Sequence, residues 1–166
     1  SLPASCAHDN SGDGVSPISG PSGVAAEADE AYSADRIADW RDHGGVLASF
    51  TVTSEARVEP SPDEIAAGEG VVGREVAVRI DSRYWQKALY QTPPDSFSFS
   101  AGGWVFGRDK PESALRVSGC PWFVVGHRYV AVLAFDSRMR RPWTVLGARR
   151  SRPMTRDRPR RWRSPS

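Results

Sequence analysis

The sequence predicts a mostly β fold, a small barrel of five to six strands with one short helix and disordered tails. Three observations carry this prediction. Short apolar segments alternate with polar residues and are separated by Gly and Pro, which is typical of strands and turns. One segment shows helical spacing instead. Both ends of the 166-residue chain are poor in apolar side chains, so only the middle can supply a core.

The helix is predicted near the start of the middle part. Residues 24–43 are Ala-rich with interspersed acids, and Tyr32, Ile37 and Trp40 recur at roughly helical spacing before Gly44-Gly45. We expect a helix over 33–42 with Ser33 as its cap. Ahead of it, residues 1–23 are rich in Gly, Ser and Pro and are expected to form a flexible leader.

The strands follow in order. Residues 46–53 alternate and are rich in β-branched side chains, and the motif Pro60-Ser61-Pro62-Asp63 ends that strand before a polar connection. In the segment 97–106, Gly102-Gly103 allows a bend or bulge. Further strands are expected over 76–80, 115–117 and 128–135, with a last edge strand over 143–146. We therefore assign the barrel domain to residues 24–148, after the leader 1–23.

The remaining residues 149–166 form an Arg-rich tail that we expect to be disordered and to contribute nothing to the fold. The net charge of +2 conceals an asymmetry, because residues 138–166 hold eleven Arg and one acid. Residues 1–137 hold eleven basic residues and nineteen acids. The tail is therefore suited to contact a polyanion or to fold back on an acidic body.

The two cysteines, Cys6 and Cys120, permit either one disulfide or two free thiols. A bridge would close a very long loop and stabilise the fold by about 4–5 kcal/mol in the chain-entropy model. No apolar run approaches the roughly 18 residues of a membrane span, and no charged and apolar leader opens the sequence. If the protein is exported, we expect its signal peptide to have been removed already.

Three segments together resemble the netrin-like modules, the OB-type barrels shared with the tissue inhibitors of metalloproteinases. They are 46–53 with its Thr-Val-Thr-Ser ending, 75–81, and the run Cys120…Phe123…Gly126…Tyr129. The resemblance covers about residues 33–147. It implies an OB-like barrel, a disulfide between Cys120 and Cys6, and an exported or cell-surface location.

The sequence departs from that family at its N-terminus. The inhibitors begin with Cys-x-Cys, whose free amine and carbonyl chelate a catalytic zinc ion. Here residues 1–5 precede Cys6, and residue 8 is His8 instead of a cysteine. Zinc chelation of that kind is therefore not expected from this chain, and the resemblance supports protease inhibition only faintly.

No catalytic motif stands out. The three histidines, His8, His43 and His127, show no metal-ligand spacing, and the sequence contains neither a Gly-x-Ser-x-Gly elbow nor a phosphate-binding loop. A Cys6-His8-Asp9 metal site would be unusual in a polar leader. We therefore expect no enzyme activity, no metal and no cofactor.

Binding is predicted at the aromatic residues that follow the strand ending near Asp81. Tyr84, Trp85 and Tyr90 are not obviously part of the core, and large aromatics beside cations favour recognition; the predicted ligand-binding residues are Tyr84, Trp85, Tyr90, Arg83 and Lys87. In the competing interpretation these rings pack under the Pro93-Pro94 loop. Trp104 and Trp122 are expected to fill the barrel and the helix contact.

Two functions follow from these observations. The first is a non-catalytic exported binding module for a protein or surface ligand. The second is an OB-type nucleic-acid-binding protein whose Arg-rich tail contacts phosphates while aromatic rings stack on bases.

Overall fold

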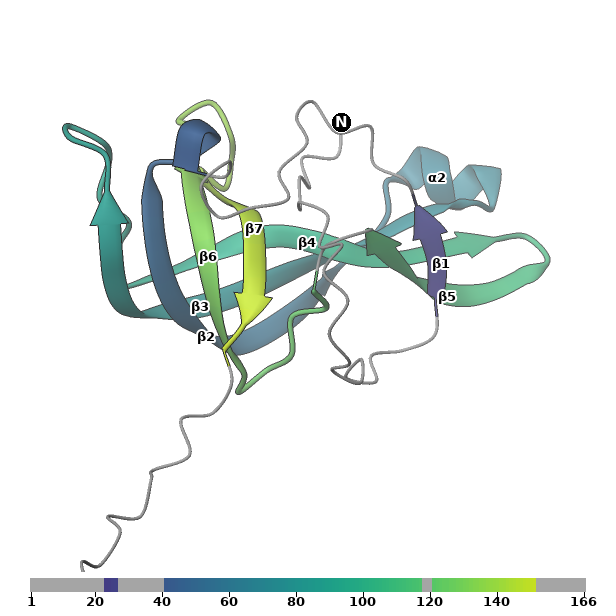
Figure 1. The fold of residues 1–166 in the computed structure, drawn as a ribbon. Coiled ribbons are helices and arrows are strands. Elements are labelled where there is room, and N and C mark those ends of the chain that lie inside the picture. Colours follow the sequence, from purple (N-terminus) through teal and green to yellow (C-terminus); the bar gives the residue numbers. More distant parts are fainter. Residues whose placement is uncertain (1–22, 27–40, 118–120, 152–166) are drawn as a thin grey trace, which may run out of the picture.

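The fold is a single curled sheet that forms a half-barrel (Figure 1). A computed structural model describes residues 23–26, 41–117 and 121–151. The strand order is β1-β5-β4-β3-β2-β6-β7. The elements are β1 (Gly23–Ala26), β2 (Val46–Val58), α2 (Pro62–Ala67), β3 (Gly70–Gln86), β4 (Ser96–Gly107), β5 (Lys110–Val117), β6 (Arg128–Phe135) and β7 (Trp143–Arg150). The predicted mostly β, barrel-like fold is confirmed.

The curl of the sheet is centred on β2, whose two neighbours pair with it over different lengths. β3 pairs with β2 along most of its length, whereas β6 pairs only with its first part, from Val46 to Thr51. Three register shifts interrupt the ladder between β2 and β3, and such bulges bend and twist strands. The curl brings β7 against β4, where the rings of Trp143 and Phe97 lie 6.0 Å apart between centroids.

The core fills the inner face, as the alternating pattern predicts. Every second residue at the start of β2 is buried, and the same period continues in β3. Four aromatic rings meet at the centre with centroid separations between 5.0 and 6.2 Å: Phe50, Phe99, Phe123 and Tyr129. Phe123 comes from the connection between β5 and β6, so that connection closes the core as a plug.

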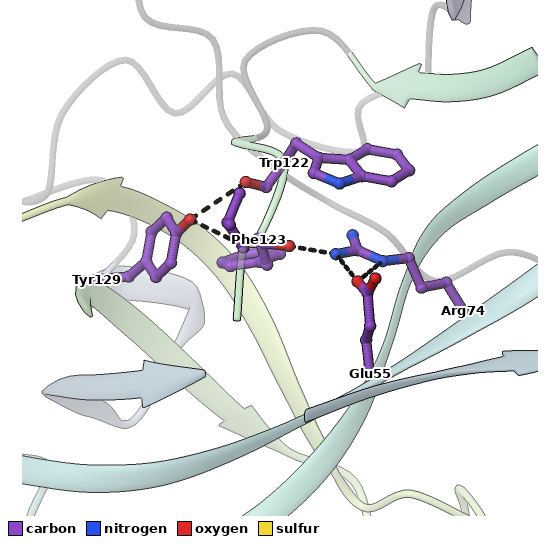
Figure 2. Close-up of polar contacts among 6 residues, drawn as sticks. Glu55, Arg74, Trp122, Phe123 and Tyr129 are labelled. Carbon is purple, nitrogen blue, oxygen red and sulfur yellow. Dashed lines mark hydrogen bonds and ion pairs between the residues drawn. The ribbon is translucent and has the colours of Figure 1, made fainter. Parts of the chain in front are cut away.

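A buried arginine fastens this plug to the sheet (Figure 2). Arg74 of β3 is only 2% exposed. Its guanidinium donates to the Glu55 carboxylate at 2.8 and 2.5 Å and also to the carbonyl oxygen of Phe123. It lies over the ring of Trp122, 4.1 Å from the centroid. We refer to Arg74, Glu55, Trp122 and Phe123 as the Arg74 latch.

Tyr129 of β6 holds the plug from the opposite side (Figure 2). Its hydroxyl donates to the carbonyl oxygen of Trp122 at 3.2 Å and accepts from the backbone N–H of Val124 at 3.0 Å. Burial of this phenol raises the pKa of Tyr129 above its usual 10.0. The plug is thus fixed by one charged and one neutral buried side chain.

The helix α2 was not predicted. Its start carries a capping box, in which the Ser61 side chain accepts from Glu64 N and the Glu64 carboxylate accepts from Ser61 N at 2.8 Å. Gly68 ends it with a φ of +72°. The Ser-x-x-Glu spacing was the available signal for this helix. Of the helix expected over 33–42, residues 41 and 42 are helical, together with residue 43, while 33–40 lie outside the described residues.

Two domain boundaries need correction. Gly23, assigned to the leader, begins β1 and pairs in parallel with Ala114 of β5. At the other end, β7 continues beyond residue 148, where Arg149 pairs with Val130 and Arg150 with Tyr129. The tail therefore does not start at 149. The undescribed residues are 1–22, 27–40, 118–120 and 152–166. Cys6 and Cys120 both lie in these ranges, so the disulfide stays a prediction.

Candidate binding surface at the loop end

The predicted binding segment lies at one end of the half-barrel. Three stretches, 41–45, 83–95 and 136–142, gather there, opposite α2 and the hairpin of β4 and β5 (Figure 1). We call these three stretches the loop end. Lys87 N donates to Gly45 O at 2.8 Å and joins the first two stretches, and Phe135 N, directly before the third stretch, donates to the Tyr90 hydroxyl at 2.9 Å. The loop end is therefore a connected surface.

The three predicted aromatic residues have different environments within it. Tyr84, the extra residue at a bulge of β3, is 56% exposed. Trp85 is half-buried, and the guanidinium of Arg41 lies 4.3 Å from its ring centroid. Tyr90 packs against the core and its ring closely approaches Gly45. Tyr84 is therefore available at the surface, the ring of Trp85 is partly covered by Arg41, and Tyr90 is structural.

The two predicted cations also have structural partners. Arg83 donates to the carbonyl oxygen of Pro93 and to the carboxylate of Asp95, both at 2.9 Å. The Lys87 ammonium donates to the carbonyl oxygen of Asp42 at 3.0 Å. Arg83 thus holds the loop that contains buried Pro93. The competing interpretation, in which the three rings pack under this loop, does not hold for Tyr84, which is 56% exposed.

The sequence analysis missed Leu89, the residue at the tip of this loop. Its side chain is fully exposed, with a relative accessibility of 106%, and its backbone has a φ of +59°. The left-handed region disfavours a residue with a Cβ by roughly 1–2 kcal/mol. The turn is nevertheless well fixed, because Tyr90 N donates to Lys87 O at 3.1 Å and the Gln86 side chain donates to Tyr90 O at 2.9 Å. The loop holds an apolar side chain in solvent at the expense of backbone strain.

The loop over 136–142 presents a second apolar side chain, Met139, which is 39% exposed. Arg138 donates to Asp136 and holds the pKa of that carboxyl below its usual 3.8. Arg141 binds the Glu75 carboxylate at 2.6 and 2.7 Å and anchors the loop to β3. As in the first loop, polar contacts fix the backbone while an apolar residue faces solvent.

A polar network supports Tyr84 from beneath. The Ser49 hydroxyl is fully buried and accepts from the Tyr84 hydroxyl at 3.2 Å and from Arg128 at 2.8 Å. Arg128 also pairs with Asp81 at 3.3 Å, and Asp81 accepts from Thr51 at 2.7 Å. This network joins β2, β3 and β6 and fixes the position of the Tyr84 ring.

The two tryptophans expected to fill the barrel are only half-buried. The rings of Trp104 and Trp122 contact each other edge to face, 5.7 Å apart between centroids. Arg57 lies over Trp104 at 4.6 Å, and Arg74 lies over Trp122 at 4.1 Å. Because an arginine already stacks on each ring, this pair is a weaker stacking platform than its composition suggests.

Within the described ranges, no cluster of three or more His, Cys, Asp or Glu residues could hold a metal ion. His127 lies beside a turn, and its Nε2 is 3.4 Å from the Arg150 guanidinium. Residue His8 lies outside the described part. None of the helices in the described ranges is long and apolar enough to cross a membrane.

The chain matches no protein-family model, no curated protein and no solved structure.

Proposed function

We propose that this protein is a non-catalytic, exported β-barrel module that binds a protein or surface ligand through its loop end. The observation that carries the proposal is Leu89, an apolar side chain held in solvent on a strained but hydrogen-bonded turn. Backbone strain of this kind occurs preferentially at ligand-binding and switch sites. Full burial of a leucine side chain in a complex would contribute about 1.5–3 kcal/mol, enough to offset the strain.

The rest of the surface fits this role. Tyr84 is 56% exposed on a rigid polar support, and Trp85 lies beside Arg41. Tyr, Trp, Met and Arg are the residues that protein-binding surfaces favour. The loop backbones are fixed before any ligand arrives, which reduces the entropy lost on binding.

The family and the location are part of the same proposal. The order of β4, β3, β2, β6 and β7, with β7 returning to β4, supports an OB-type barrel. A netrin-like module would carry a disulfide from Cys120 toward the N-terminus and would be exported. The cysteine pair in the sequence supports that location.

A nucleic-acid-binding function is the second candidate, because the charge of the barrel does not oppose it. Most of the acidic excess of residues 1–137 lies in residues 1–40, which hold seven acids and one Arg. The described residues hold fifteen Lys and Arg and twelve Asp and Glu. The barrel itself would therefore not repel a polyanion held by the Arg-rich tail.

Chemical-shift mapping on the full-length protein tests the proposed function. The ligands are a panel of lipid vesicles, oligosaccharides, peptides and single-stranded oligonucleotides. We expect the perturbed amides of the described part to cluster in 41–45, 83–95 and 136–142, with residues 62–67 of α2 as an unaffected reference. Perturbations confined to 152–166 on adding an oligonucleotide would favour the second candidate. A panel with no binding, or binding centred on Trp104 and Trp122, would contradict the proposal.

A further inference from the structure

We infer that the ligand of the loop end is a lipid surface with anionic headgroups. This inference rests on the proposed function and specifies the ligand class of the same surface. It is carried by two features that coincide at one end of the molecule, exposed apolar loop tips and an excess of positive charge.

The apolar side chains project singly from different loops. Leu89 is fully exposed on the loop after β3, and Met139 is 39% exposed on the loop after β6; Tyr84, near the end of β3, is 56% exposed. Each loop is fixed by its own hydrogen bonds. Separate tips of this kind can enter the boundary between headgroups and acyl chains, where apolar and aromatic side chains are stabilised.

The two ends of the molecule, the loop end and the α2 end, also differ in charge. The loop end holds six cations and three acids: Arg41, Arg83, Lys87, Arg138, Arg140 and Arg141 against Asp42, Asp95 and Asp136. Because Glu75 of β3 pairs with Arg141, the excess at this end is two positive charges. Residues 54–70, which include α2 at the opposite end of β3, hold five acids and one Arg. An anionic surface would therefore attract the loop end and repel the α2 end, which orients the molecule before contact.

A lipid surface explains this arrangement better than a protein partner. A protein interface usually buries a contiguous, closely packed patch with charged residues excluded from its centre. Here the exposed apolar residues come from separate loops, and cations stand near them in the sequence: Lys87 is two residues from Leu89, and Arg138 and Arg140 flank Met139. A bilayer interface needs no matching shape, and it accommodates neighbouring Lys and Arg at the headgroups.

Vesicle co-sedimentation of the full-length protein tests the inference. The probes are vesicles of phosphatidylcholine alone and vesicles of phosphatidylcholine and phosphatidylglycerol in equal parts. We expect binding only to the anionic vesicles. Leu89→Asp should weaken it by about tenfold or more, because the leucine is no longer buried in the interface. Arg140→Gln should weaken it by about fivefold, the expected effect of one juxtamembrane charge.

Matched controls separate the loop end from the rest of the chain. Ile65→Asp changes a leucine-sized side chain that is 59% exposed on α2, and Lys110→Gln removes a cation from the β4–β5 hairpin; neither should alter binding. The Arg-rich residues 152–166 are present in every variant, so their attraction to anionic vesicles is constant.

The outcomes distinguish the two proposals. If Leu89→Asp binds anionic vesicles as tightly as the unchanged protein, the loop end does not insert and the inference is overturned. Absence of vesicle binding overturns it as well. In both cases the proposed function survives if another ligand of the mapping panel perturbs the loop end, and it fails if none does.

Discussion

Replacing Arg74 with alanine is expected to lower the free energy of unfolding by about 2–4 kcal/mol, because it breaks a buried ion pair. Arg74 is 2% exposed, and its loss leaves the Phe123 carbonyl without its donor and Trp122 without the guanidinium on its ring. The Glu55 side chain is 41% exposed and can be hydrated again, which limits the loss. Urea unfolding monitored by tryptophan fluorescence measures the change.

Arg57 provides the matched control for this prediction. It lies opposite Arg74 on the neighbouring strand and also combines a carboxylate partner, Glu112, with a stacked ring, Trp104. Its side chain is 47% exposed, so water competes with both contacts. Arg57→Ala should therefore cost much less stability than Arg74→Ala. Equal losses in the two variants would show that the Arg74 latch does not hold the plug.

Replacing Gly103 with alanine is expected to destabilise the fold by about 3 kcal/mol or more, at the upper end of the range for overpacking. A Cβ at this position would lie 2.1 Å from the carbonyl oxygen of Val72 and 3.0 Å from the carbonyl carbon of Gly73. Both are backbone atoms of the paired strand β3, so no side-chain rotation can relieve the clash. Thermal unfolding followed by far-UV circular dichroism measures the effect.

Gly107→Ala is the control on the same strand. Its added Cβ would meet only the Lys110 side chain, at 3.9 Å, which is an ordinary contact. This variant should keep the melting temperature of the unchanged protein. If Gly103→Ala were equally harmless, β3 and β4 would not approach each other as closely at Gly103 as the structure has them.

The core strands were predictable because their burial follows the sequence period. The pattern of Val46, Ala48, Phe50 and Val52 identified β2, and the predicted range 128–135 coincides with β6. Gly102-Gly103 indicated an irregularity, and the ladder between β3 and β4 shifts its register opposite these glycines. In each case a short local pattern, alternating apolar residues or a pair of glycines, is enough to predict the conformation.

Elements that depend on pairing with a distant segment were not predictable in this way. β1 is the four-residue sequence Gly-Val-Ala-Ala, which acquires strand geometry by pairing with β5. The end of β3 was interpreted as a loop because its alternation breaks after Asp81. The break has a physical cause, since Asp81 and Tyr84 are extra residues at two bulges and the strand continues beyond them.

The sequence predicted where the candidate site lies, but it did not predict which of its residues bind and which hold the loops together. The segment from Arg83 to Tyr90 does lie at a surface, yet Arg83 and Tyr90 hold neighbouring loops together. Leu89 was missed because the binding residues were sought among aromatic side chains beside cations. Neither the positive φ of Leu89 nor its exposure can be predicted from the neighbouring sequence.

Leu89→Gly, with stability and affinity for anionic vesicles measured on the same preparation, tests the central claim that strain at Leu89 is retained for binding. Glycine adopts a φ of +59° without a steric penalty, and Leu89 is fully exposed and so contributes little burial to the fold. We predict that the free energy of unfolding stays unchanged or rises by up to about 1 kcal/mol, while vesicle affinity falls by about fivefold or more. Unchanged affinity, or a melting temperature lowered by several degrees, would contradict the account.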